Sequence, residues 1–244
     1  MVIVLIITAV RVKSMDSHRI SGRILAENIA GPGMMRLVEQ SMQAQAQKTS
    51  VTEIAVKEWK HPQAALTFDD GPDIRYTPLL LDGLKERNVR ASFFLLGEKV
   101  EQYPELVERM QKEGHLVGNH TYHHVQLDKL NETKAREEIL KTNNLIYETT
   151  GVYPLYLRPP FGAWKKNLEL CVEMLPVFWT IDTLDWKVQN TEKIVRTVKE
   201  QIEDGAIILM HDEYDTSVEA ALQVADDLKA QGYQLVTVDQ LILP

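Results

Sequence analysis

The sequence predicts an α/β fold with a largely parallel sheet, and three observations support this prediction. From Ala64 onward, short apolar runs alternate with longer segments of helical period, which is typical of repeated strand–helix units. Residues that can do chemistry follow several of the apolar runs directly, where α/β folds place their active sites. The chain has 244 residues, 44% hydrophobic and 25% charged, which suits one sizeable α/β core.

About seven apolar runs are predicted as strands, with helices between them. The strands are expected at residues 64–68, 91–96, 115–118, 155–158, 177–181, 206–210 and 234–238. The helices are expected at residues 77–87, 104–112, 132–149, 167–175, 191–203 and 217–230. Thr191 precedes an acidic first turn, and Gly205 and Gly232 follow helical runs, so these helices carry start and stop signals.

The first 60 residues are predicted to be an extension, and residues 61–244 a catalytic domain. Residues 1–10 are apolar and precede Arg11 and Lys13. This run is shorter than the roughly 20 residues that span a bilayer, and it lacks the basic start and cleavage site of a complete secretory signal. Two interpretations stay open: the remnant of a membrane anchor, and a buried strand. The stretch that follows, rich in Gln, Ser and Ala, is interpreted as a stalk.

The charge balance argues against nucleic acid as a partner. Lys and Arg number 27 against 35 Asp and Glu, which gives a net charge of -8. A surface of this sign repels phosphate backbones. Cys171 is the single cysteine, so no intrachain disulfide can form.

Two adjacent acids end the first predicted strand. Asp69 and Asp70 follow an apolar run and precede a Gly71–Pro72 break, in the segment TFDDGP. Side chains of neighbouring strand residues point to opposite faces, so both acids can serve one site only where the strand ends and turns. A polar turn that caps a helix is the structural alternative for this segment.

A histidine-rich segment follows the third predicted strand. His120 and His124 are four residues apart, which would place both rings on one face of a helical turn, while His123 faces elsewhere. His123 is interpreted as a surface group, with a spare ligand as the alternative. Together with Asp70, the pair would give two histidines and one carboxylate with open positions for water and substrate. This set predicts a metal site.

Three further segments carry candidate residues: RPPFG from Arg158, DTLDW from Asp182 and LMHD from Leu209. Each has an ordinary structural alternative. Arg158 could pair with a surface acid, Asp182 or Asp185 could cap the following helix, and Trp186 could be core.

Taken in order, these five segments resemble the signature boxes of the polysaccharide deacetylases of carbohydrate esterase family 4, also called the nodulation-protein-B homology domain. The boxes are TFDDGP, H-[ST]-x-x-H, R-P-P-[YF]-G, D-x-x-D-W and L-x-H-D, and the match covers residues 64–243. The resemblance implies a distorted (β/α) barrel with fewer strands than the regular eight. It also implies a divalent metal, zinc by first expectation, with cobalt or nickel as alternatives.

The resemblance also implies a role for each matching residue. Metal ligands would be Asp70, His120 and His124. Asp69 would be the general base, oriented by Arg158, and His211 the general acid, oriented by Asp185. The backbone N–H of Phe161 would help to hold the oxyanion, and Trp186 and Leu209 would form an apolar wall for the acetyl methyl group. Many relatives have tyrosine where this chain has Phe161, which should cost a substrate contact and leave the backbone donor intact.

The function expected from this resemblance is removal of the acetyl group from N-acetylglucosamine residues in a glycan such as peptidoglycan or a chitin-like oligomer. The enzyme is expected to be a monomer outside the cytoplasm, at the cell surface or secreted, with attachment to the membrane through its N-terminus. Three alternatives stay open: an amidohydrolase of small nitrogenous compounds, a catalytically silent glycan-binding protein, and a non-haem iron oxygenase. Acetate release from glycans, the phenotype of Asp69→Asn, and anaerobic activity without a reductant would separate them.

Overall fold

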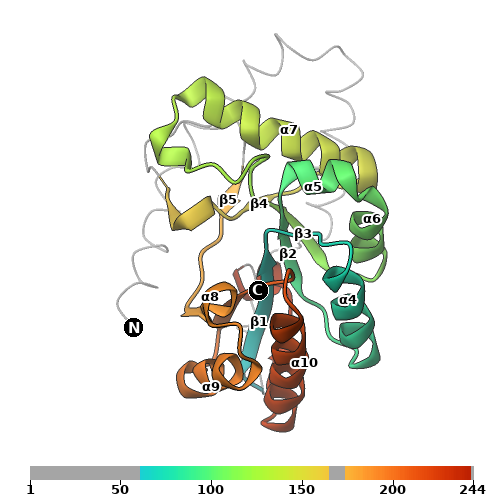
Figure 1. The fold of residues 1–244 in the computed structure, drawn as a ribbon, viewed down its shortest axis with the longest axis vertical. Helices are drawn as coiled ribbons and strands as arrows, with labels where there is room; N and C mark the ends of the chain where they lie inside the picture. The colour runs from blue at the N-terminus through green and yellow to red at the C-terminus, as the bar shows by residue number, and fades with distance from the viewer. Residues whose placement is uncertain (1–60, 165–173, 243–244) are drawn as a thin grey trace, which may run out of the picture. The chain divides into compact units, whose positions relative to one another are not determined.

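The computed structural model describes residues 61–164 and 174–242, which form a parallel α/β sheet curled into an open half-barrel (Figure 1). The strand order is β5-β4-β3-β2-β1-β7-β6, with β8 paired to β1, and every pairing is parallel. This architecture confirms the predicted fold class. The expected extension, residues 1–60, lies outside the described residues.

The strand β1 (Gln63–Asp69) lies in the interior of the sheet, and all seven of its residues are buried. It pairs with β2 (Ser92–Leu95) on one side and with β7 (Ala206–His211) on the other. A strand covered on both faces needs a nearly continuous apolar sequence, which is why its apolar run predicts it correctly. The in-register pairing of Asp69 with His211 brings two chemically active residues to the same end of the sheet.

The remaining strands extend the sheet in both directions. They are β3 (Leu116–Asn119), β4 (Tyr156–Leu157), β5 (Leu175–Pro176), β6 (Ile181–Asp182) and β8 (Gln234–Leu235). The single strand expected at residues 177–181 is wrong, because β5 pairs with β4 and β6 pairs with β7 at opposite edges of the sheet. Residues 177–180 connect these two edges.

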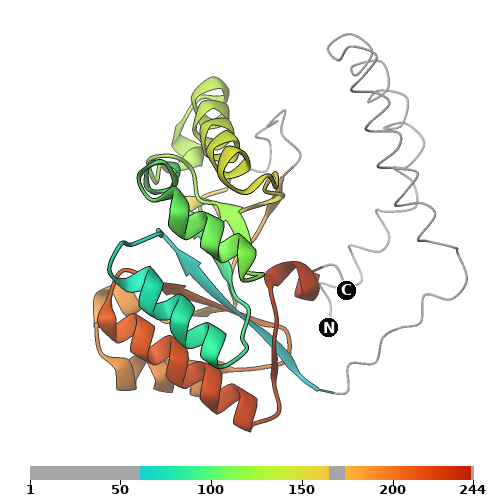
Figure 2. The same ribbon diagram turned by 90° about the vertical axis from the view of Figure 1, so that its right-hand side faces the viewer.

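Helices pack around the sheet. They are α4 (Tyr76–Glu86), α5 (Gly97–Gln102), α6 (Pro104–Lys112), α7 (Glu132–Thr150), α8 (Asp185–Val188), α9 (Thr191–Gln201), α10 (Asp215–Ala230) and α11 (Val238–Ile242). Figure 2 shows α4 and α10 side by side, and their apolar faces pack on β1 and β2 around Phe68 and Phe93. Burial of these faces against the sheet forms the main core.

The structure differs from the predicted helices in four places. Most of the helix expected at residues 167–175 lies outside the described residues, and its last residue, Leu175, belongs to β5. The short helices α5, α8 and α11 are absent from the prediction because four to six residues give too few turns for a helical period. Among the described residues, no helix has both the length and the apolar character needed to cross a membrane.

Candidate functional site

The candidate site lies at the carboxyl ends of β1, β3, β4 and β7, together with the start of α8. These strand ends supply Asp69 and Asp70, the loop that begins at His120, Arg158, and His211. Parallel strands converge at this edge, so residues from five distant segments meet there. The structure brings together seven of the polar residues that the sequence singled out: Asp69, Asp70, His120, His124, Arg158, Asp185 and His211.

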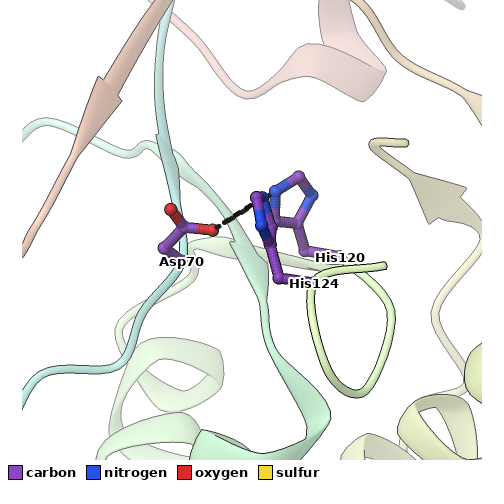
Figure 3. Close-up of side chains that lie close together, drawn as sticks. All are labelled: Asp70, His120 and His124. Atoms are coloured by element: carbon purple, nitrogen blue, oxygen red, sulfur yellow. Dashed lines mark ion pairs between the residues drawn. The ribbon is translucent and has the colours of Figure 1, made fainter. Parts of the chain in front are cut away.

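Asp70, His120 and His124 form a group of three potential metal ligands, with one ligand atom from each residue within 4.8 Å of the others. Oδ1 of Asp70 lies 3.4 Å from Nε2 of His120 and 3.5 Å from Nε2 of His124. Figure 3 shows the carboxylate pointing toward the two imidazole rings. A tetrahedral zinc ion with bonds of about 2.0–2.1 Å requires ligand atoms roughly 3.3 Å apart, so these spacings fit such an ion.

The protonation states of the three residues in this group also suit the binding of a cation. Oδ1 of Asp70 is buried, and it has no hydrogen-bond partner among the described residues. Nδ1 of His120 lies 2.6 Å from the carbonyl oxygen of Arg158, which fixes the proton on Nδ1 and leaves the Nε2 lone pair free. Burial lowers the pKa of His124, which favours the neutral imidazole that a metal ion needs. The donor set therefore suits a divalent metal.

Charge also favours the ionised form of Asp70. Burial alone would raise its pKa, but the nearby imidazole of His120, together with the charges of His124 and His211, holds the pKa well below its usual range. An ionised carboxylate that faces two nitrogens and has no hydrogen-bond partner among the described residues contributes little to stability, but it is well suited to bind a metal ion.

The expected helical turn at residues 120–124 is wrong. Thr121 has a φ of 66° and His124 a φ of 54°, both in the left-handed region, so the segment is an irregular loop. The rings of His120 and His124 still meet, with centroids 5.0 Å apart, because the loop turns back on itself. His123 is exposed, and Nδ1 of its ring lies 2.8 Å from Oε1 of Glu138, so in this structure it is not a member of the metal group.

Asp69 is held on the opposite side by a buried arginine. Nη1 of Arg158 donates to Oδ1 of Asp69 at 2.8 Å and to Oγ1 of Thr67 at 2.7 Å. The other carboxylate oxygen of Asp69, Oδ2, lies 3.8 Å from Nε2 of His120. The arginine thus occupies one oxygen of Asp69 and leaves the other facing the metal group.

His211 and Asp185 form a second pair. Nδ1 of His211 lies 2.7 Å from Oδ1 of Asp185, and Nε2 of His211 lies 3.8 Å from Oδ2 of Asp70. Oδ2 of Asp185 accepts hydrogen bonds at 2.7 Å from the backbone N–H of His211 and from Oγ of Ser217. Burial alone would lower the pKa of His211, but the hydrogen bond and charge of Asp185, with the charges of Asp69 and Asp70, raise it to about 9.

The three predicted substrate contacts have different environments. Phe161 is 67% exposed and adopts a left-handed φ of 60°, and its ring meets that of His124 edge to face at 4.6 Å. Its backbone N–H donates to no described residue. Trp186 is half exposed in α8, directly after Asp185, and Leu209 is buried in β7 on the same side as His211. All three lie close in sequence to a residue of the polar cluster.

The sequence did not reveal two residues that contact this cluster. Thr67 accepts from Arg158 and donates to the carbonyl oxygen of Ile208 at 2.7 Å, and Ser217 donates to Asp185. Thr67 belongs to the TFDDGP segment and faces the same side as Asp69, so the two-residue strand period could have identified it. Ser217 lies in α10, and no local signal connects it with Asp185.

Comparisons with known proteins agree with this geometry. The sequence profile described as polysaccharide deacetylase matches residues 57–177. A peptidoglycan-N-acetylglucosamine deacetylase of Bacillus cereus is 40% identical over 186 residues, which cover 73% of this chain and 68% of that protein. The structure of the peptidoglycan deacetylase PdaC from Bacillus subtilis is 43% identical, with a TM-score of 0.73, and the match covers 75% of this chain and 91% of that one.

Other relatives are much longer than the matched region. The peptidoglycan-N-acetylglucosamine deacetylase PgdA of Listeria monocytogenes is 43% identical over 177 residues, which are 72% of this chain and 38% of that protein. The match therefore spans little more than a third of that relative.

Proposed function

The chain belongs to the polysaccharide deacetylase family, and from that premise we propose that it removes acetyl groups from N-acetylated sugars of peptidoglycan by metal-dependent hydrolysis. The relatives named above act on peptidoglycan, two of them on its N-acetylglucosamine residues. The products are acetate and a glycan that carries a free amine.

One observation carries the proposal: a base and an acid flank the metal group. Oδ2 of Asp69 and Nε2 of His211 each lie 3.8 Å from a different member of the group. Amide hydrolysis needs a base to activate water and an acid to protonate the leaving amine. A protein that only binds glycan has no use for either residue.

Asp70, His120 and His124 would hold the metal, with Nε2 of each histidine and Oδ1 of the aspartate as ligand atoms. A bound divalent ion lowers the pKa of water and polarises the acetamide carbonyl. We propose zinc, since two imidazoles and one carboxylate with open positions are typical of catalytic zinc sites. Cobalt and nickel are the alternatives.

Asp69 is assigned the base. Oδ1 is engaged by Arg158, so Oδ2 is the atom that accepts the proton of the attacking water. The hydroxide oxygen bonds to the acetyl carbon, and the proton stays on Asp69. Arg158 keeps the carboxylate in this orientation through both of its Nη1 hydrogen bonds.

His211 is assigned the acid. Its Nδ1 is bonded to Asp185, and the raised pKa of the ring keeps Nε2 protonated near neutral pH. As the carbon–nitrogen bond breaks, Nε2 gives its proton to the sugar nitrogen, so acetate and a free amine leave. Asp185 stabilises the imidazolium until that transfer.

Phe161 and the apolar pair complete the assignment. The backbone N–H of Phe161, which has no acceptor among the described residues, is suited to donate to the carbonyl oxygen as its negative charge develops. Trp186 and Leu209 would enclose the methyl group of the acetyl. This wall favours an acetylated sugar over a larger acyl group.

Acetate release from purified peptidoglycan and from chitooligosaccharides tests the proposal, with the full chain stripped by a chelator and then supplied with Zn²⁺. We expect release only after Zn²⁺ is restored, and a loss of about 10²–10⁴-fold in kcat for Asp69→Asn. Asp182→Asn is the matched control, because among the described residues the side chain of Asp182 bonds only the N–H of Leu184 in its own turn. Absence of acetate from both substrates would overturn the proposal, and release from small amides alone would favour the amidohydrolase alternative.

The same assay identifies the sugar. Mass spectrometry of muropeptides after digestion separates loss of acetyl from N-acetylglucosamine and from N-acetylmuramic acid. We propose the former, which is the sugar in the names of the Listeria and Bacillus cereus relatives.

The proposed substrate sets the location of the enzyme. Peptidoglycan lies outside the cytoplasmic membrane, so we propose that the chain acts there, at the cell surface or secreted. Attachment through residues 1–60 and a monomeric state remain predictions, which cell fractionation and light scattering would test.

A further inference from the structure

The loop that carries both histidine ligands is tied to α7 through one side chain, Glu138. Oε2 of Glu138 accepts the backbone N–H of Tyr122 at 3.0 Å and that of His123 at 2.9 Å. Oε1 lies 2.8 Å from Nδ1 of the His123 ring. Three of the four polar contacts that Glu138 can make through its oxygens thus go to the short segment between His120 and His124.

Three other backbone groups of this loop have separate partners. The carbonyl oxygens of Thr121 and Tyr122 accept from the N–H groups of Gly97 and Glu98, at 2.9 and 3.2 Å, in the first turn of α5. The N–H of Thr121 donates to Oδ1 of Asn119 at 2.7 Å. Among the described residues, Glu138 is therefore the sole acceptor for the two amides in the middle of the loop.

The loop needs such an anchor because its backbone is unfavourable. Thr121 and His124 both adopt left-handed φ values, which residues other than glycine rarely take, and Thr121 is also β-branched. Such a conformation persists only where surrounding contacts fix it. A carboxylate that receives two adjacent amides fixes the orientation of the peptide planes between the two histidines.

We propose that Glu138 is a positioning residue for the metal centre. In this proposal His123 is a hydrogen-bond partner that holds the Glu138 carboxylate in place, and it is not a metal ligand. The inference rests on the metal site of the proposed function. Glu138 acts through the loop backbone, which sets the direction in which Nε2 of His120 and Nε2 of His124 point. Loss of its carboxylate lets the loop relax, and the two ligands then meet Asp70 less often in the required geometry.

Zn²⁺ affinity of the full chain tests this, measured by competition with a chromophoric chelator in the absence of substrate. We expect Glu138→Ala to weaken binding by about 10–100-fold, as for other outer partners of metal ligands. Glu138→Gln keeps one acceptor oxygen and should fall in between. Glu137→Ala is the matched control, because Glu137 is the exposed neighbour on α7, and it should bind Zn²⁺ like the parent.

A second readout separates positioning from general stability. At saturating Zn²⁺, kcat of Glu138→Ala should return to within about threefold of the parent, because the ligands themselves remain. Circular dichroism verifies that each variant is folded at the assay temperature. A folded Glu138→Ala variant with unchanged Zn²⁺ affinity would overturn the inference, and so would a kcat that Zn²⁺ cannot restore.

The outcome is distinguishable from failure of the proposed function. If the parent binds Zn²⁺ and Glu138→Ala weakens it, but no glycan yields acetate, then the substrate assignment fails and the positioning role stands. If the parent binds no Zn²⁺, both fail.

Discussion

Arg158 donates from Nη1 to Oδ1 of Asp69 at 2.8 Å, and the two side chains are 0% and 4% exposed. The guanidinium also lies over the ring of Phe94, at 4.3 Å from its centroid. Burial of an arginine this deep lowers stability unless a charged partner accompanies it, so Arg158 and Asp69 depend on each other within the site. The first prediction concerns this pair.

Replacement of Arg158 by Met should leave Asp69 as an unpaired buried carboxylate. We expect the free energy of unfolding in urea to fall by about 3–5 kcal/mol, and kcat to fall because Oδ1 is no longer held. The double variant Arg158→Met with Asp69→Asn removes both charges, so it should recover part of the lost stability but none of the activity. Equal stability of the single and double variants would contradict the idea that the charges are coupled.

Asp185 raises the pKa of His211, and its removal should change the pH dependence of catalysis. Without the carboxylate, burial dominates and the pKa of His211 falls, so the ring loses its proton at lower pH. For Asp185→Asn we expect the basic limb of kcat/KM to move toward lower pH by about 1–3 units. The profile of kcat/KM against pH between 5 and 10 measures this shift.

Asp182→Asn again serves as the control for this profile. Among the described residues, its side chain accepts only the N–H of Leu184, two residues further along the chain, a contact that the carboxamide oxygen keeps. The limb should stay in place in this variant. A limb that also stays in place in Asp185→Asn would mean that another group, and not His211, sets it.

Much of this site was predictable because parallel strands end at a common edge. Asp69 and His211 follow two apolar runs, far apart in sequence, that pair in register. Strand burial makes such runs easy to recognise, and the sheet geometry then brings their ends together without further information. The gathering of these candidate residues at one edge is therefore evident in the sequence once the strands are placed, whereas their roles as ligand, base and acid are implied by the family resemblance and stay proposals.

The remainder depends on contacts that leave no local signal. The four-residue spacing of His120 and His124 suggested a helical turn, whereas tertiary hydrogen bonds from Glu138 and α5 hold a left-handed loop. Likewise, the apolar run after residue 174 reads as one strand, although its two ends belong to opposite edges of the sheet. The spacing of apolar residues indicates which side chains are buried, but it does not indicate which strands form the edges of the sheet.

Replacement of Gly71 by alanine, the smallest possible change, should destabilise the protein. A Cβ at this position would lie 2.5 Å from Oδ1 and 2.8 Å from Oδ2 of Asp212. Asp212 is fully buried, and Thr77 donates to its Oδ2, so the carboxylate cannot easily move aside. We expect Gly71→Ala to lower the free energy of unfolding by about 1–3 kcal/mol and to lower kcat, since the adjacent Asp70 must shift.

A double-mutant cycle identifies the source of that loss. Asp212→Ala removes the colliding carboxylate, so in the double variant the added methyl group has room. Gly71→Ala should then cost less in the Asp212→Ala background than in the parent, by about 1 kcal/mol or more. Strict additivity of the two changes would show that the collision with Asp212 is not the cause.

His115 should make the folded state sensitive to acid at a point away from the metal group. Its side chain is buried at the start of β3, where its ring packs edge to face against Phe93 at 5.3 Å. Nδ1 accepts the backbone N–H of Ala91 at 3.1 Å, which only a neutral imidazole can do. Burial, opposed by the charge of Glu113, lowers the pKa of His115 to about 4.

The direction of the effect follows from proton uptake. The unfolded chain binds a proton at this histidine near pH 6.5, whereas the folded chain stays neutral until about pH 4. The stabilisation is therefore complete above pH 6.5 and is lost as the pH falls toward 4. Between pH 7 and 4.5 this single group should lower the free energy of unfolding by about 2–3 kcal/mol.

Urea unfolding of the parent and of His115→Asn at the two pH values measures the contribution. The asparagine oxygen can replace Nδ1 as the acceptor for Ala91 and does not titrate, although it packs less well on Phe93. The variant should be less stable than the parent at pH 7, but it should lose about 2–3 kcal/mol less on acidification. Carboxylate titration is common to both proteins and cancels in this difference, so parallel losses would mean that His115 is already protonated in the folded state.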